Sequence, residues 1–88
     1  MRYSLVRMSD GAGDSGPMCQ ILDSESWTPI PDVTRPRLGC GVRVGSIYAR
    51  TMSAQDWWQC TPITEILEER EDYMKFKTRN SVYEWKMF

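Results

Sequence analysis

The stretches YMKFKT at positions 73–78 and VYEWKM at positions 82–87 decide the fold class of this 88-residue chain. Apolar and charged residues alternate along both, which is typical of strands with one buried and one solvated face. The connection between them contains Asn80, a residue that readily adopts the left-handed backbone conformation of a tight turn. These features predict an antiparallel hairpin. The side chains expected on its inner face are Met74, Phe76, Tyr83, Trp85 and Met87.

The segment immediately before this hairpin, residues 61–72, fits two interpretations. Thr61 as an N-cap, Pro62 at the first helical position and apolar residues at helical spacing favour a helix. The same residues also alternate as in a strand, with the acidic run 68–72 as a polar turn into the hairpin. The local sequence by itself favours the helix.

The first half of the chain is less regular. Residues 3–8, which contain β-favouring Tyr and Val, and residues 18–22 are expected to form two short strands. Residues 9–17 contain three glycines and a proline, which predicts a loop between those strands. Residues 23–36 carry three further prolines and are expected to be extended and irregular. The segment Val42–Thr51 is expected to form a strand that is buried on much of both faces.

Length and composition limit the classes of protein that fit this chain. Eighty-eight residues, of which 41% are hydrophobic and 26% charged, indicate one globular domain spanning residues 1–88. There is no histidine, which excludes histidine-based catalysis and histidine metal ligands. No segment approaches the ~18 apolar residues of a membrane span, so a membrane partner is not expected.

Charge is distributed unevenly along the chain. The net charge is −1, so no overall field favours nucleic acid or membrane as a partner. Residues 33–60 nevertheless carry four arginines against one aspartate, which gives this third a net charge of +3. We therefore expect an anionic ligand, if there is one, to bind in the middle of the sequence.

The cysteines indicate a reducing compartment. Cys19, Cys40 and Cys60 are odd in number and form no C-x-x-C pair. The first residues lack the apolar core of a signal peptide, so we expect a protein of the cytoplasm with thiols that act as small buried hydrophobes. A disulfide between Cys40 and either of the other two is the alternative.

No catalytic set is evident in the sequence. The glycine-rich segment 11–16 lacks the G-K-[S/T] ending of a P-loop, and its aspartate would repel a phosphate. Most of the acidic residues at 65–72 fall in the contiguous run E-E-R-E-D at 68–72, which is typical of a solvated turn rather than of paired catalytic carboxylates. We therefore predict that the protein is not an enzyme and holds neither a cofactor nor a metal.

The most informative candidate residues for binding are the adjacent Trp57 and Trp58. Neighbouring residues in a strand point to opposite faces, so one ring is expected in the core and the other largely exposed, in contact with a partner. Arg43, Arg50 or Tyr48 is predicted to flank the exposed ring. The alternative is a bulge that lets both rings pack inward.

A second candidate is the basic set Lys75, Lys77 and Arg79, which we expect to share one strand face and to attract an anion. Alternating lysines are also ordinary on a solvated sheet, where they discourage edge pairing. The sequence favours this second interpretation.

Part of the sequence resembles a known group of proteins. The segments 56–67 and 76–83, the latter containing Thr78-Arg79-Asn80-Ser81-Val82-Tyr83, resemble the C-terminal half of small uncharacterised phage and prophage proteins that end in a T-x-N-S-x-Y hairpin. The resemblance covers the C-terminal half only. It implies a small β-barrel and a phage origin rather than an activity, and it favours a strand for residues 61–67.

The expected fold is a single mainly-β domain, a small SH3-like or OB-like partly open barrel. Its C-terminal half is expected to be an antiparallel meander of Val42–Thr51, Trp58–Leu67, Tyr73–Thr78 and Val82–Met87. Beside the four aromatic and methionine residues of the hairpin at positions 74, 76, 83 and 85, the inner face should include Val44 and Ile66.

The expected function follows from the absence of a catalytic set, the small size and the phage resemblance. We predict a non-enzymatic phage-encoded binding protein in the cytoplasm of the host cell. Its partner is predicted to be a host protein or protein complex of a defence system, either a CRISPR effector or a nucleotide-signalled system. The alternatives are a small β-barrel that binds nucleic acid or a nucleotide, and a minor virion or assembly protein.

Overall fold

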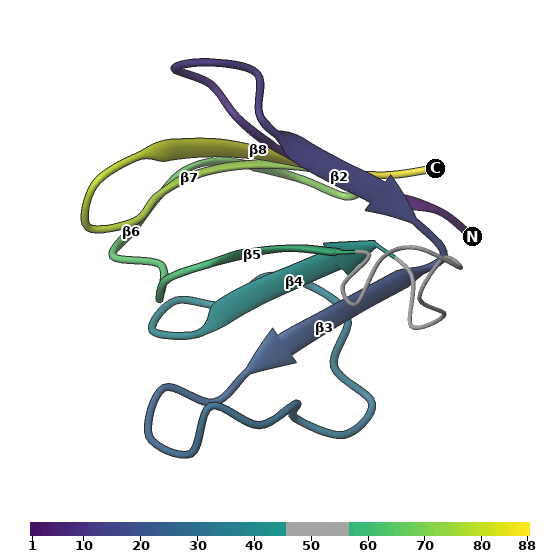
Figure 1. Cartoon of the computed structure of the whole chain (residues 1–88), viewed down its shortest axis with the longest axis vertical. Coiled ribbons are helices and arrows are strands. Elements are labelled where there is room, and N and C mark those ends of the chain that lie inside the picture. The colour runs from purple at the N-terminus through teal and green to yellow at the C-terminus, as the bar shows by residue number, and fades with distance from the viewer. Residues whose placement is uncertain (46–56) are drawn as a thin grey trace, which may run out of the picture.

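The protein is built from two antiparallel β-sheets that face one another, as the computed structural model shows (Figure 1). The structure describes residues 1–45 and 57–88. Within these residues there are eight strands and no helix, and the sheets remain separate rather than closing into a barrel. The prediction of a mainly-β, partly open fold is confirmed.

Five strands form the larger sheet and three form the smaller one. The larger sheet has the order β2-β1-β8-β7-β6, with β1 (Tyr3–Arg7), β2 (Gly13–Gly16), β6 (Glu65–Arg70), β7 (Tyr73–Lys77) and β8 (Val82–Met87). The smaller sheet has the order β3-β4-β5, with β3 (Met18–Leu22), β4 (Gly41–Gly45) and β5 (Trp57–Cys60).

The chain passes between the two sheets at two places. β2 runs into β3 through Pro17 alone, and β5 leads into β6 through residues 61–64. Most paired strands are consecutive in sequence; in addition, β1 pairs with β8. The fold is therefore an up-and-down meander in which the first and last strands lie side by side.

The C-terminal hairpin was predicted correctly, whereas the segment before it was only partly so. β7 and β8 pair antiparallel, with Phe76 opposite Tyr83. The local helix interpretation of residues 61–72 is wrong, because Ile66 pairs with Phe76 and packs against the core, and this tertiary contact outweighs helical propensity. The expected single strand Trp58–Leu67 is instead split between the two sheets. The polar turn was expected at residues 68–72 and is shorter, because residues 68–70 of this acidic run belong to β6.

The first half departs from the sequence expectations at one element. The strands expected at 3–8 and 18–22 are present as β1 and β3. The expected loop 9–17 contains β2. Glycine has no side chain, so the backbone of this segment can lie close to neighbouring strands. A Cβ at Gly16, for example, would overlap the carbonyl oxygen of Gly45 in β4. The first part of the strand predicted at Val42–Thr51 is present in β4. Residues 46–51 lie outside the described residues.

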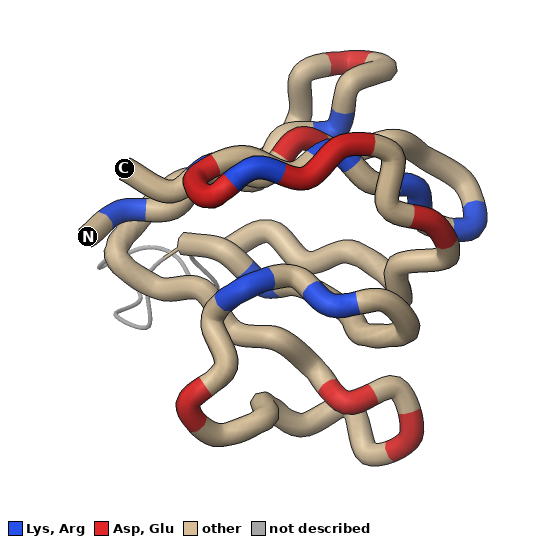
Figure 2. Tube along the Cα trace, turned by 180° about the vertical axis from the view of Figure 1, so that it is seen from behind, with Lys and Arg blue, Asp and Glu red and all other residues tan. Residues whose placement is uncertain are grey.

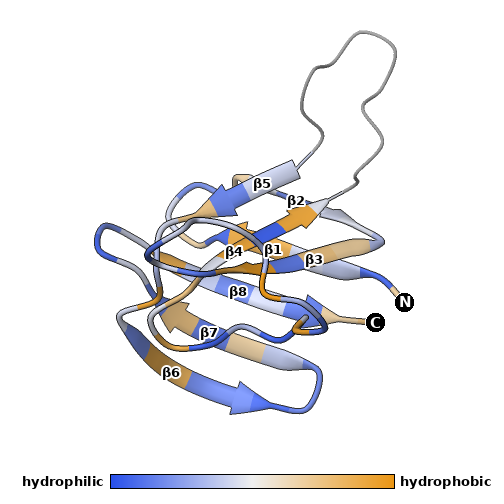
Figure 3. Cartoon of the chain, turned by 90° about the horizontal axis from the view of Figure 1, so that it is seen from below, coloured by the Kyte–Doolittle hydropathy of each residue, from blue (hydrophilic) through white to orange (hydrophobic). Residues whose placement is uncertain are grey.

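The hydrophobic core lies between the sheets. Hydrophobic and hydrophilic residues alternate along the strands (Figure 3), so that each sheet turns an apolar face inward. The rings of Phe76 and Tyr83 stack with their centres 5.9 Å apart. Of the residues expected on the inner face, Ile66 and Met87 are only partly buried. The others are buried: Val44, Met74, Phe76, Tyr83 and Trp85.

Residues 23–40, which we call the strap, cover one side of the core, and their first part, 23–36, is irregular as predicted. The strap first follows the free edge of β3, where the Ile30 amide donates to the Ile21 carbonyl at 2.8 Å. It then reaches the turn between β6 and β7, where Arg35 donates to the carbonyl oxygens of Arg70 and Glu71 at 2.6 and 2.7 Å. The strap thus joins the two sheets on this side.

Candidate functional site

A single charged residue stands in the small sheet. The strands β3, β4 and β5 have the sequences MCQIL, GVRVG and WWQC, in which Arg43 is the one ionised group. Val42 and Val44 on either side of it are fully buried, so Arg43 lies on the face of the sheet that points away from the core. In Figure 2, charges are instead interleaved along the strands of the large sheet.

The side chain of Arg43 is held in place by its neighbours in the sheet. It lies opposite Gln20 of β3 and Gln59 of β5. Its Nε donates to Gln59 Oε1 at 2.9 Å and its Nη1 to Gln20 Oε1 at 3.1 Å. The guanidinium carbon also lies 4.9 Å from the centre of the Trp57 ring. These contacts orient the cation, and neither of the two hydrogen-bond acceptors is a carboxylate.

The two adjacent tryptophans occupy opposite faces of the small sheet, as predicted. Trp58 packs against the core with its indole nitrogen buried, and the guanidinium of Arg7 lies 5.1 Å from its ring centre. Both rings are half-buried, so the prediction that one would be largely exposed is wrong. The physical reason is that an arginine covers part of each ring. The alternative with both rings in the core is also not observed.

The structure brings together some of the predicted partner-binding residues. Arg43 and Trp57 are in contact on the outer face of the small sheet, and Trp58 faces the core. Tyr48 and Arg50 lie outside the described residues. Sequence reasoning missed Gln20 and Gln59. Only the pairing register of the three strands reveals them as neighbours of Arg43, and that register is not readable from the residues alone.

The second predicted set lies on and beside the large sheet. Lys75 and Lys77 share the outer face of β7, because Met74 and Phe76 between them are buried. Arg79 belongs to the turn after β7 rather than to the strand. Acidic residues face these lysines in the register, so the outer face carries both signs of charge (Figure 2).

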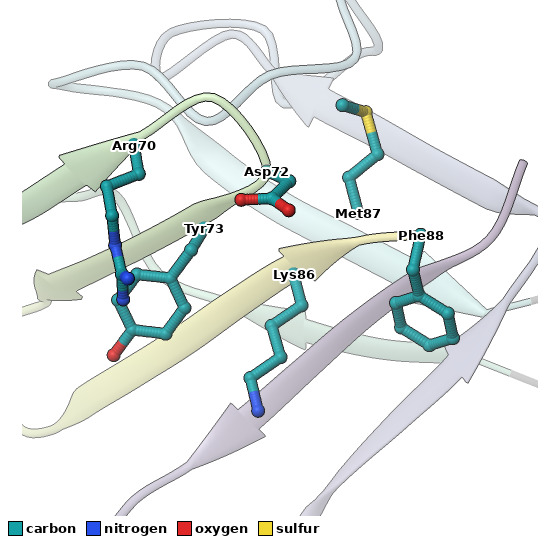
Figure 4. A pocket seen from close by; sticks show the side chains of 6 residues that line it. All are labelled: Arg70, Asp72, Tyr73, Lys86, Met87 and Phe88. Atoms are coloured by element: carbon teal, nitrogen blue, oxygen red, sulfur yellow. The ribbon is translucent and has the colours of Figure 1, made fainter.

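A shallow pocket of about 260 Å³ lies at one end of this outer face (Figure 4). The guanidinium of Arg70 lies 4.4 Å from the ring centre of Tyr73 and pairs with Glu68 at 2.9 Å. The Tyr73 hydroxyl donates to Glu84 at 2.5 Å, and this bond to a carboxylate raises the pKa of Tyr73 to about 12. These polar groups therefore satisfy one another, which is typical of a surface network.

Two of the three cysteines lie in the core. All three thiols are free, and Cys19 and Cys60 are buried. Burial raises the pKa of the Cys19 thiol to about 11 and that of Cys60 to about 12. Because the thiolate is the reactive form, these two side chains act as small hydrophobic residues at neutral pH.

Within residues 1–45 and 57–88, no group of three His, Cys, Asp or Glu side chains is placed to hold a metal ion. The described part of the chain also contains no helix long and apolar enough to cross a membrane. No protein-family model, curated protein or solved structure matches the chain.

Proposed function

We propose that this protein is a non-enzymatic binding protein that contacts its partner through the outer face of the small sheet. The observation that supports the proposal is the arrangement around Arg43, a cation fixed by two amides and stacked on Trp57. Arginine and tryptophan are the residue types that most often dominate the binding energy of protein interfaces. Here they occur as a pre-arranged pair on a face without other charges in its strands.

The arrangement favours a protein partner that presents a carboxylate beside an apolar group. A guanidinium that is already oriented loses little side-chain entropy when it forms a bidentate bond to a carboxylate. Trp57 adds apolar area directly beside the charge. The partner would cover both groups, which are half-buried in the free protein.

The resemblance of the C-terminal half to phage and prophage proteins supports a biological setting for this activity. In our proposal the protein is phage-encoded, acts in the host cytoplasm and inhibits a host defence system by binding one of its components. A CRISPR effector or a component of a nucleotide-signalled system is the class of partner that we propose.

The proposal is tested with charge and ring variants of the small-sheet face. Tagged wild-type protein, R43E and W57A are used to capture partners from a lysate of defended host cells, and the captured protein is purified and its affinity measured. We expect R43E and W57A to weaken binding at least tenfold. K86E, an exposed charge reversal on the large sheet, should bind like the wild type.

The same variants give a result in cells. Wild-type protein should restore phage growth in a defended host, and R43E should not, although both are folded by circular dichroism. Equal affinity of R43E and wild type for the purified partner would refute the assignment of this face. Failure of the wild type to bind any defence component or to restore growth would refute the proposed function.

Nucleic acid or a nucleotide is the second candidate ligand, because an arginine beside an indole is also found where bases stack. The geometry favours it less, since Arg43 already lies over the Trp57 ring that a base would need. Oligonucleotide binding that is strong at low salt and falls steeply with added salt would support this candidate over the protein partner.

A further inference from the structure

The outer face of the large sheet carries a groove that is separate from the Arg43 face. The groove has a volume of about 550 Å³. It lies where β6, β7 and β8 meet the turns that follow β1 and β7. Its lining residues are Met8, Ser9, Leu67, Lys75, Asn80, Ser81 and Val82.

Apolar side chains are gathered in this groove instead of being buried. Met8 is 46% exposed and Leu67 is 43% exposed, and Val82 lies between them on β8. A bulge shifts the register between Ile66 and Glu68, so that Leu67 is the additional residue opposite β7. Exposed apolar residues that are scattered singly need no explanation, but here two exposed apolar side chains and the half-buried Val82 line one groove.

The groove also contains a lysine that forms no ion pair with the residues that the structure describes. Lys75 lies opposite Glu68 and Glu84 in the register. Glu68 is paired with Arg70 at 2.9 Å, and Glu84 accepts the hydroxyl of Tyr73 at 2.5 Å. Among the described residues no carboxylate lies within ion-pair distance of Lys75, so its ammonium group is free to meet a charge from outside.

We propose that this groove binds an extended peptide segment of a protein partner, in which an apolar side chain is followed by an acidic one. The apolar side chain would lie against Met8, Leu67 and Val82, and the carboxylate would meet Lys75. Asn80 and Ser81 at the rim supply hydrogen-bonding groups for the peptide backbone. The volume falls in the range of roughly 300–1,000 Å³ that is usual for ligand sites.

The proposal is tested by NMR titration with two synthetic peptides, Ac-DLFDL-NH2 and its basic counterpart Ac-KLFKL-NH2. We expect the acidic peptide to shift the backbone amide signals of Leu67, Lys75 and Ser81, and to leave that of Arg43 unchanged. In the variant K75E the preference should reverse in favour of the basic peptide. Equal shifts with both peptides, or none at millimolar concentration, would overturn the proposal.

Matched leucine variants separate binding from folding. Leu67 and Leu38 are both exposed, and Leu38 lies in the strap outside the groove. L67S should weaken binding of the acidic peptide at least tenfold, whereas L38S should leave it unchanged. If the same amide signals shift with protein concentration in the absence of peptide, a second copy of the chain occupies the groove and the peptide proposal is wrong.

Discussion

Arginine side chains lie on three of the tryptophan rings of this protein. Besides Arg43 on Trp57, the guanidinium of Arg7 lies 5.1 Å from the ring centre of Trp58, and that of Arg35 lies 5.7 Å from the ring centre of Trp85. Each such contact stabilises a protein by roughly 0.5–2 kcal/mol, depending on its exposure. At the scale of single residues, these contacts allow a thin domain to cover large rings with flexible charged side chains.

Burial should make the three cysteines react at very different rates. With iodoacetamide at pH 8, we expect Cys40, which is half-buried, to be modified in the folded protein. Cys19 and Cys60 should react only after unfolding, because burial raises their pKa values to about 11 and 12 from the ordinary 9.0. Intact mass measurement during the reaction counts the modified thiols.

The same pKa values imply how stability depends on pH. A thiol with a raised pKa contributes its full stability below pH 9 and loses it as the pH rises toward 11 and 12.

The variant C40S serves as the control for the alkylation, since it should remain unmodified until denaturant is added. Rapid modification of folded C40S would contradict the burial of the other two thiols.

At the scale of elements, the sequence predicts those strands that carry their own signal. The β7–β8 hairpin follows from alternation alone, because each strand buries one face. β6 has residues that fit a helix or a strand, and its pairing with β7 decides between them. β2 consists of GDSG and has no apolar pattern, so only its partner β1 defines it as a strand. Which strands pair with one another, apart from the β7–β8 hairpin, could not be predicted from the sequence.

In the candidate site, too, some residues could be predicted from the sequence and others depend on strand pairing. The sequence indicated Arg43 because it lies in the basic middle third of the chain, and Trp57 because it is adjacent to Trp58 in a predicted strand. It did not indicate Gln20 and Gln59, because the contacts of glutamine depend on which strand lies beside it. The opposite orientation of Trp57 and Trp58 follows from strand geometry, but their partial burial depends on distant arginines.

The passage from β2 to β3 should tolerate no side chain at Gly16. A Cβ at this position would overlap the Gly45 carbonyl, so G16A must move β2 away from β4. We expect G16A to lower the free energy of unfolding by about 1–3 kcal/mol, as measured by urea denaturation. S15A, an exposed position on the same strand, should change it by less than about 0.5 kcal/mol. A G16A variant as stable as the wild type would show that the two strands are not in close contact.

At the scale of the whole molecule, Arg35 connects the strap to the large sheet. It donates to two backbone carbonyls and to Glu69 at 3.2 Å, and its guanidinium lies against Trp85. We expect R35A to lower the free energy of unfolding by about 1–2 kcal/mol in urea denaturation, since the side chain is partly exposed and its ion pair is screened. R37A, an exposed arginine of the same strap, is the control and should change it by less than about 0.5 kcal/mol. Equal effects of the two variants would contradict the connecting role of Arg35.

The pairing of β1 with β8 has a consequence for how the protein is made. The small sheet consists of neighbouring strands, so it can assemble while the ribosome is still adding residues. β1 emerges first, but one of its edges pairs with β8 and Arg2 exchanges two backbone hydrogen bonds with Phe88. That edge of β1 stays unpaired until residues 82–87 have been synthesised. The nascent chain therefore carries an unpaired strand edge until β8 leaves the exit tunnel.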